Sequence, residues 1–378
     1  MLVVAGRDRP LRYTREDGCR AWLAHGMIPL SRMAALLEAF GSYEAIYDRF
    51  RSQGPSVLRG CVNERQLALL GERAQPAAMH EMMLIMHRLE MGLLAPDDSA
   101  YPEALRNIQD PPFLLFCRGN PACLSGRLIA MVGSRKASRT GERATYAIAK
   151  ELSANGVSIV SGLAMGIDTA ALKGGLEGGT PVIGVAACGL DVDYPAANHG
   201  LKEQIIAAGG ALISEYPPGT LPLRHHFAVR NRIMSGLSSA VLMMEGSIRS
   251  GSMLTVQHAL DQGREVYAYP GEPGTVWAEG AHQLLREGAN YFASARDVLE
   301  DMGWLNEAPQ VEPQKLPSLA PEQQRVYALL QRGELSFDEL AAASGLEAQA
   351  LSAALTMLKI MGLVEDLPGK VYKTAKAV

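Results

Sequence analysis

The sequence predicts an α/β fold, and two observations support this prediction. Between residues 93 and 303, short apolar runs alternate with helix-length segments that end in glycine, which is typical of β-α units whose strands are buried on both faces. After residue 320, three helical patterns precede a short hairpin. We therefore expect an extended Rossmann-like doubly wound sheet, flanked by a small helical N-terminal domain and a C-terminal winged-helix domain.

Residues 1–92 predict the small helical (SAM-like) domain. Apolar residues recur there at helical spacing and are separated by small breakers such as Gly41. A run of methionines between Met79 and Met86 has the spacing of one helix face. Methionine at that spacing usually fills a core, so no function is assigned to it.

Two further domains follow. Residues 93–303 carry the strand and helix alternation, and closely spaced prolines from Pro309 to Pro321 predict a linker over 304–320, because proline cannot continue a helix. Residues 321–378 then predict the winged-helix domain. Its expected helices and strands cover 321–331, 337–343, 347–361, 363–366 and 370–373.

Composition restricts the classes of function. A chain of 378 residues with a net charge of −4 is not coated in basic surface, so any nucleic-acid site must be local. Five cysteines with no CxxC pair favour reduced thiols over disulfides or a zinc site. No signal peptide and no apolar run of membrane-spanning length is recognisable, so we expect a cytoplasmic protein without a membrane span.

Short Gly/Ser motifs stand where apolar runs end. They are Gly133-Ser134-Arg135, Ser161-Gly162, Gly189-Leu190-Asp191 and Ser250-Gly251-Ser252. Glycine lets backbone N–H groups approach an anion, and a helix N-terminus favours negative charge, so the motifs predict a phosphate-lined crevice. Neither the dinucleotide nor the Walker spacing is present, which argues against nicotinamide and ATP. The alternative for Arg135 is a surface arginine beside a tight turn.

Other residues leave two interpretations open. Lys173 falls on the helix after Ser161-Gly162, near the crevice or on a solvated surface. Asp191 and Asp193 could bind a metal or cap a turn, and capping is favoured. Glu245 is placed like a catalytic base, yet no second acid or nucleophile matches it, so a structural or base-reading role is favoured.

Cations gather in one segment of nine residues. Arg224, Phe227, Arg230, Asn231 and Arg232 combine three guanidiniums, an amide and an aromatic ring. Cations can track phosphates and an exposed ring can stack on a base, which suits single strands. Core packing is the alternative for the ring, and the adjacent histidines at 225 and 226 lack a third zinc ligand.

In this order, the motifs resemble the DNA processing protein A family (DprA, also called Smf) over about residues 97–290. Further matches are Tyr101-Pro102, Leu105, Pro111-Pro112, Gly166-Ile167-Asp168, Tyr194-Pro195, Ser214-Glu215, Pro270-Gly271 and Gly288-Ala289. Two positions depart from the family pattern: Leu172 stands in place of histidine, which removes a polar group near the crevice, and Gly246 stands in place of alanine.

The resemblance implies a protein of natural transformation that binds single-stranded DNA in the Rossmann crevice, protects it and loads RecA recombinase onto it. It also implies a homodimer, no cofactor and no catalytic turnover. The expected nucleic-acid-binding residues are Gly133, Ser134, Arg135, Ser161, Gly162, Lys173, Arg224, Phe227, Arg230, Asn231, Arg232, Glu245, Ser250, Gly251 and Ser252.

The sequence gives two competing hypotheses little support. A nucleotide phosphoribohydrolase of the lysine-decarboxylase-like type requires PGGxGTxxE, but Glu272 replaces the glycine at the third position of this motif and Ala278 replaces the catalytic glutamate. A transcription factor requires a basic recognition helix, but the helix expected at 347–361 has one cation, Lys359. The winged helix is therefore expected to be auxiliary or to bind protein, with Lys370, Lys373 and Lys376 as its only DNA edge.

Overall fold

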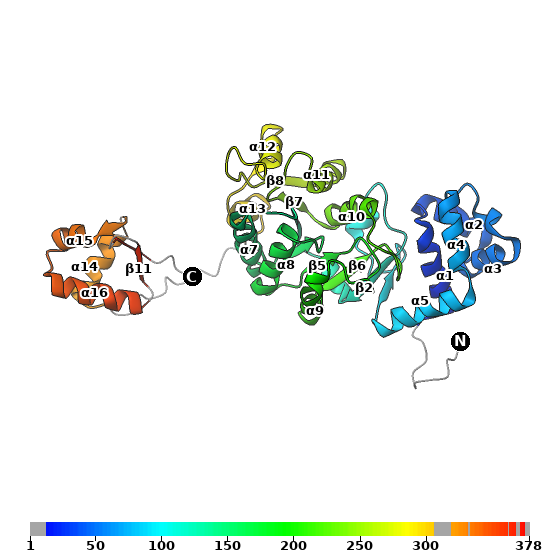
Figure 1. Cartoon of the computed structure of the whole chain (residues 1–378), viewed down its shortest axis with the longest axis horizontal. Helices are drawn as coiled ribbons and strands as arrows, with labels where there is room; N and C mark the ends of the chain where they lie inside the picture. Colours follow the sequence, from blue (N-terminus) through cyan, green and yellow to red (C-terminus); the bar gives the residue numbers. More distant parts are fainter. Residues whose placement is uncertain (1–12, 306–318, 332, 362, 368–370, 375–378) are drawn as a thin grey trace. The chain divides into compact units, whose positions relative to one another are not determined.

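The structure, a computed structural model, describes residues 13–305, 319–331, 333–361, 363–367 and 371–374. The chain divides into two compact units, Met1–Leu305 and Asn306–Val378. Most of the linker expected at 304–320 lies outside the described residues. Figure 1 shows the helices and strands of both units.

The N-terminal segment of the first unit is helical. Its elements are α1 (Arg15–Leu23), η1 (Ala24–Gly26), α2 (Leu30–Phe40), α3 (Tyr43–Gln53), η2 (Pro55–Leu58), α4 (Glu64–Arg73) and α5 (Pro76–Arg88). Trp22 is fully buried and meets the rings of Tyr47 and Phe50 edge-on, at 5.2 and 5.0 Å between centroids. The methionine stripe of α5 is buried too, so these methionines fill the core as expected.

A nine-stranded sheet forms the rest of the first unit, in the order β1-β2-β6-β5-β4-β3-β7-β8-β9. Its strands are β1 (Gly92–Leu94), β2 (Leu115–Gly119), β3 (Leu128–Val132), β4 (Ser158–Ser161), β5 (Ile183–Val185), β6 (Ala211–Ser214), β7 (Ala240–Met243), β8 (Glu265–Ala268) and β9 (Asn290–Tyr291). The strands from β6 to β9 in this order run parallel.

The edge of the sheet differs from the parallel arrangement that the apolar runs predict. Strand β2 pairs with β6 antiparallel, and β1 pairs with β2 antiparallel. An apolar run indicates burial on both faces but carries no information on strand direction. The edge strands β1 and β9, with three and two residues, are too short to give a recognisable run.

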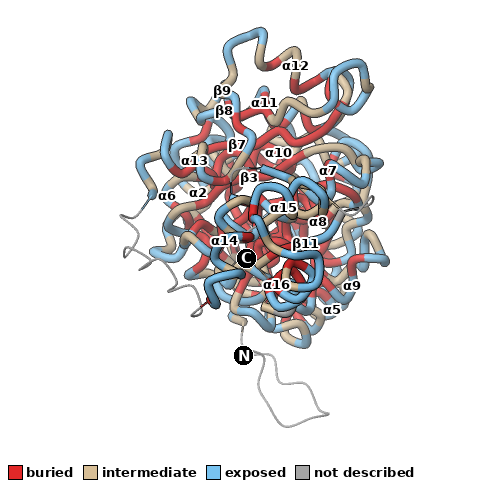
Figure 2. The backbone as a smooth tube through the Cα atoms, turned by 90° about the vertical axis from the view of Figure 1, so that its left-hand side faces the viewer, coloured by how far each residue is buried: buried red, intermediate tan, exposed pale blue. Residues whose placement is uncertain are grey.

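Helices cover both faces of the sheet, which confirms the doubly wound fold. They are α6 (Glu103–Arg106), α7 (Arg139–Ala154), α8 (Ile167–Gly178), α9 (His199–Ala207), α10 (Arg224–Leu237), α11 (Gly251–Asp261), α12 (Glu279–Arg286) and α13 (Ala295–Asp301), with turns η3 (Pro121–Leu124) and η4 (Ala196–Asn198). Ile129 and Met131 of β3 pack in one core with α7, α8, α9 and α13. Their neighbours Leu128 and Ala130 pack in a second core with α10, α11 and α12. Figure 2 shows the resulting buried interior beneath an exposed outer surface.

Strand order locates the crevice of this sheet. The chain passes from β3 to β4 on one side, whereas β7 lies on the other side of β3. Loops after β3 and β7 therefore diverge at a topological switch point, the place where open α/β sheets bind ligands beyond the carboxyl ends of their strands.

The second unit has the element order of a winged helix. It contains α14 (Pro321–Leu330), β10 (Leu335–Ser336), α15 (Phe337–Ser344), α16 (Ala348–Ile360), β11 (Val364–Leu367) and β12 (Val371–Thr374). The three strands form an antiparallel sheet in the order β10-β12-β11. Across the described parts of both units, we find no helix with the length and apolarity needed to cross a membrane.

Candidate functional site

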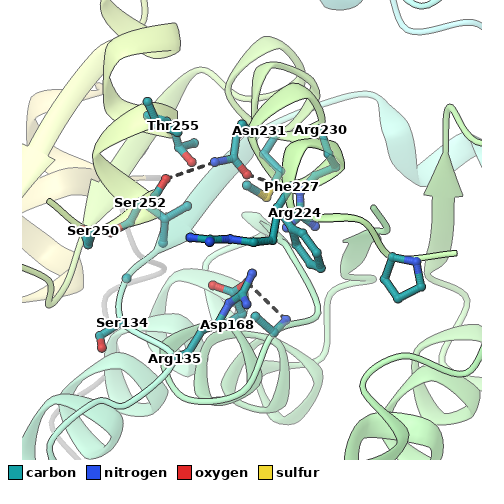
Figure 3. A pocket seen from close by; sticks show the side chains of 18 of the residues that line it. Ser134, Arg135, Asp168, Arg224, Phe227, Arg230, Asn231, Ser250, Ser252 and Thr255 are labelled. Carbon is teal, nitrogen blue, oxygen red and sulfur yellow. Dashed lines mark hydrogen bonds between the residues drawn. The ribbon is translucent and has the colours of Figure 1, made fainter. Parts of the chain in front are cut away.

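A cavity of about 520 Å³ opens at the switch point, a size within the range of small-molecule and cofactor sites. Figure 3 shows its side chains converging from the β3 and β4 loops, α10 and the start of α11. The expected residues that line this switch-point cavity are Gly133, Ser134, Arg135, Arg224, Phe227, Arg230, Asn231, Ser250, Gly251 and Ser252. Ser161, Gly162, Lys173, Arg232 and Glu245 are absent from its lining.

The rim of the cavity carries two exposed guanidiniums. Arg135 follows β3 and Arg224 begins α10, and neither forms an ion pair with any described residue. The Arg135 guanidinium lies over the half-buried ring of Phe227, with its carbon 4.5 Å from the ring centroid. These two arginines are free to meet an anion, and the Phe227 ring supplies an apolar surface beneath Arg135.

Arg230 lines the cavity but is held from inside the protein. It is 3% exposed, and its Nη1 donates to the carbonyls of Gly162, at 2.7 Å, and Val185. A Cβ at position 162 would lie 2.6 Å from Arg230 Nη2 and 2.7 Å from Asp168 Oδ2, so Gly162 is needed to admit both charged groups. Gly162 thus serves this interior pair and makes no contact with the cavity.

Burial has opposite effects on the two charges beside Gly162. It raises the pKa of the Asp168 carboxyl and lowers the pKa of the Arg230 guanidinium, while each charge opposes the shift of the other. Each charge therefore favours the ionised form of the other. Asp168 lines the cavity as well.

Arg232, a predicted nucleic-acid contact, is directed into the protein and away from the cavity. Its guanidinium is 7% exposed and donates two hydrogen bonds to Glu215, at 2.9 and 2.5 Å, and one to Asp110, at 3.2 Å. Burial alone would lower the pKa of Arg232, but Glu215 and Asp110 outweigh it and raise the pKa. Arg232 is therefore a structural cation, because α10 turns it away from the cavity.

Glu245, another predicted nucleic-acid contact, is bound within the protein, which agrees with the structural role that the sequence left open. Its carboxylate accepts hydrogen bonds from the Ser138 N–H, at 2.8 Å, and from Ser138 Oγ, at 2.6 Å, at the N-terminus of α7. A Cβ at Gly141, in the first turn of α7, would lie 2.1 Å from Glu245 Cδ. The carboxylate thus occupies the helix end that the sequence predicts as a phosphate site after β3.

The N-terminus of α11, in contrast, faces the cavity. Ser250, Gly251 and Ser252 all line it, and the N-cap Ser250 makes no side-chain capping bond. Ser250 Oγ and Ser252 Oγ lie 2.6 Å apart, and Asn231 Nδ2 donates to the Gly251 carbonyl at 3.1 Å. Of the two helix ends at the switch point, only this one remains available to an anion.

Three further positions discussed in the sequence lie outside the switch-point cavity: the predicted contacts Ser161 and Lys173, and Leu172, which departs from the family pattern. Ser161 is fully buried, and its hydroxyl donates to the Met131 carbonyl at 2.7 Å. This hydrogen bond connects β4 to β3. Lys173 is exposed and lines a separate cavity between α7 and α8. Leu172 is fully buried in the core, so position 172 does not face the crevice.

Some cavity residues were missed from the sequence. They are Val132, Ala164, Asp168, Tyr194, Pro222, Ala228, Met234, Arg249, Leu254 and Thr255. Asp168 and Tyr194 stand in quoted motifs, and Arg249 precedes Ser250, so these three had a signal. Thr255 had none: its buried hydroxyl has no hydrogen-bond partner among the described residues, and it reaches the cavity only because α11 turns it there.

In the remaining acidic motif, Asp191 caps a turn, whereas Asp193 contacts basic side chains. Asp191 accepts from the Gly219 N–H at 2.9 Å, and Asp193 pairs with Lys202 at 3.1 Å and His199 at 3.3 Å. Within the described part of the chain, no three His, Cys, Asp or Glu side chains are grouped to hold a metal ion.

In the winged-helix unit, two of the described basic side chains are paired, whereas Arg325 of α14 is exposed and forms no ion pair with a described residue. Lys359 of α16 lies 2.7 Å from Asp366, and Lys373 of β12 lies 3.6 Å from Glu365. Lys370 and Lys376, the other expected basic positions, fall outside the described residues. The described surface of this unit therefore offers less free positive charge than the cavity rim.

A doubly wound domain with a switch-point cavity, followed by a winged helix, defines a Rossmann-type binding protein. Comparison with known families identifies both domains. The family DNA recombination-mediator protein A matches residues 92–303, and the DprA winged helix domain matches residues 310–370. The chain belongs to the DprA family, whose members are also called Smf.

Individual relatives agree with this assignment. A putative DNA processing protein DprA of Mycobacterium tuberculosis is 34% identical over 93% of both chains. DprA from Streptococcus pneumoniae has a similar structure, with a TM-score of 0.62 and 33% identity over 76% of this chain and 98% of that one. DprA from Helicobacter pylori, whose structure has been described for its single-stranded DNA binding mode, has a TM-score of 0.51 and 29% identity over 57% of this chain and 96% of that one.

Proposed function

We propose that the chain binds single-stranded DNA in the switch-point cavity and does not turn it over. The observation that carries this proposal is a cavity rim that presents the Arg135 and Arg224 guanidiniums, which form no ion pair with any described residue, together with the ring of Phe227. Guanidiniums pair with phosphates, and a ring with an accessible face accepts any base. The α11 N-terminus adds N–H groups on the opposite wall.

The position of Arg135 gives the binding step a physical requirement. Its guanidinium occupies the face of Phe227 on which a base would stack. Arg135 must therefore leave that face or stack on the incoming base as the strand binds. In either case its charge stays at the rim, where a phosphate of the same nucleotide can meet it.

The wider role that we propose follows from family membership: a cytoplasmic homodimer that protects incoming DNA during natural transformation and loads RecA recombinase onto it. Two cavities in one dimer would hold two stretches of the same strand, which increases affinity through effective concentration. The winged helix is assigned an auxiliary or protein-binding role, because two of its three described cations, Lys359 and Lys373, are already paired with carboxylates.

Arg135→Ala tests the cavity. We expect its affinity for an oligothymidylate to fall by about 10- to 100-fold, since a hydrogen bond to a charged group contributes roughly 1.5–3 kcal/mol. Arg296→Ala is the control, because Arg296 is exposed on α13 and pairs with Glu300 at 2.6 Å.

Fluorescence anisotropy over a salt series provides the measurement. Wild-type protein should prefer single strands to duplex of the same length and should lose affinity as salt rises. Equal affinity for duplex, or an Arg135→Ala variant that binds like wild type, would overturn the proposal.

A further inference from the structure

A second cavity, of about 610 Å³, lies between α7 and α8. Arg139, Arg143 and Tyr146 line it from α7, while Lys173 lines it from α8 and Met165 from the preceding loop. We call this cavity the α7–α8 groove. Of the residues that line it, only Lys173 is among the nucleic-acid contacts predicted from the sequence.

The charges of the groove are unbalanced. Arg139, Arg143 and Lys173 are exposed, and none of them forms an ion pair with a described residue, although Glu142 also lines the groove. Farther along the same two helices the charges are matched, because Lys150 pairs with Glu177 at 2.8 Å. Unpaired positive charge is thus confined to one end of the helix pair.

Close packing fixes this arrangement. A Cβ on Gly174 would lie 2.3 Å from the Tyr146 carbonyl oxygen, and one on Gly178 would lie 2.4 Å from the Lys150 carbonyl oxygen. The two glycines therefore let α7 and α8 run side by side in backbone contact, as Figure 1 shows. Cations on a rigid helix pair keep their spacing when a ligand arrives.

The groove adjoins the switch-point cavity. Ala164 lines the cavity, and the next two residues of the same loop, Met165 and Gly166, line the groove. Gly166 also packs on the backbone of Arg135: a Cβ there would lie 2.4 Å from the Ser134 carbonyl oxygen. The loop that carries Arg135 therefore forms the border between the two sites.

We infer that the α7–α8 groove holds the sugar-phosphate backbone of the DNA strand where the strand leaves the switch-point cavity. This inference rests on the proposed function. Arg139, Arg143 and Lys173 meet successive phosphates, while the cavity holds the base that stacks on Phe227. Contacts of this kind are independent of sequence but require a strand long enough to reach beyond the cavity.

The double variant Arg143→Ala/Lys173→Ala tests the groove. Binding should be measured for two oligothymidylates, one of about 2 nucleotides that the cavity alone can hold and one of about 20 that extends past it. Lys150→Ala is the matched control, because it removes a cation from the same helix pair but from the paired end.

We expect the double variant to keep wild-type affinity for the short strand and to lose about 5- to 10-fold for the long one. The salt dependence of the long strand should also fall by about 1.4 in log–log slope, since each phosphate contact on a single strand contributes about 0.7. Lys150→Ala should match wild type in both measurements.

Each contrary result has a distinct meaning. Unchanged affinity and slope for the long strand would overturn the groove assignment and leave the cavity intact. Equal losses for both strands would also overturn it, because the cations would then act on the cavity itself. Failure of wild-type protein to bind either strand would instead overturn the proposed function.

Discussion

The two halves of helix α10 use the same residue types in opposite ways. At its start, Arg224 is exposed and Phe227 half-buried, and both line the cavity. Farther along, Arg230 and Arg232 are 3% and 7% exposed and are bound to carbonyls or carboxylates of the interior. A cluster of arginines in a sequence therefore combines two functions, and burial together with the bonded partner separates them.

The largest expected effect lies in the interior half. Arg232→Ala would leave Glu215, which is 9% exposed, as a buried charge without its main partner. Breaking such a pair costs about 3–5 kcal/mol, so we expect the free energy of unfolding of the sheet domain to fall by that amount. Chemical denaturation followed by circular dichroism measures this change.

Arg118→Ala is the control for this substitution. Arg118 pairs at 3.4 Å with Glu203, whose side chain is half-exposed, so its loss should cost less than about 1 kcal/mol. Similar destabilisation by both substitutions would contradict the separation of α10 into an interior and a rim half.

A smaller effect is expected at the rim. Phe227→Leu keeps an apolar side chain but removes the ring, so affinity for single-stranded DNA should fall by about 1–3 kcal/mol, the usual contribution of base stacking. Stability should change little, because the ring is only half-buried. Anisotropy titration and thermal denaturation of the same sample provide both values.

Loss of stability with wild-type affinity would assign Phe227 to the core and reverse this prediction. Leu223→Ala is the control for Phe227→Leu, because Leu223 is an exposed apolar residue just before α10.

The smallest effect concerns pH. Burial, with a further contribution from His225, lowers the pKa of His226, which stacks on Tyr216 between the two halves of α10. As pH falls, His226 is therefore protonated in the unfolded chain at a higher pH than in the folded protein. Stability from neutral His226 is therefore fully present above the ordinary histidine pKa of about 6.5 and is lost as pH falls from there through the lowered folded-state pKa.

His226→Gln should remove this loss. We expect the denaturation midpoint of wild-type protein to fall more between pH 7 and pH 5.5 than that of the variant. Parallel pH dependence in the two proteins would show that the folded state does not lower the pKa of His226.

Much of the fold could be predicted because its signals are local. The apolar runs at Leu128–Val132 and Ala240–Met244 correspond to β3 and, within one residue, to β7 in the structure. The helices between strands follow from their capping residues and glycines. Strand direction at the edge could not be predicted, because pairing of β2 with β6 joins segments almost a hundred residues apart.

The site was predictable to a lesser extent. Strand-end motifs correctly placed Arg135 and Ser250 on one cavity, since the carboxyl ends of parallel strands meet at one edge. The sequence could not show that Arg232 meets Glu215 or that Glu245 meets Ser138. Both contacts depend on side-chain direction and on residues distant in the chain.

The Glu245 carboxylate gives the switch point a built-in counterion. One helix end there, that of α7, is already neutralised by the protein itself, while the other, that of α11, is not. An incoming phosphate therefore encounters an attractive wall and a screened one. The electrostatic potential across the cavity is therefore uneven, and an anion in it is drawn toward the α11 wall.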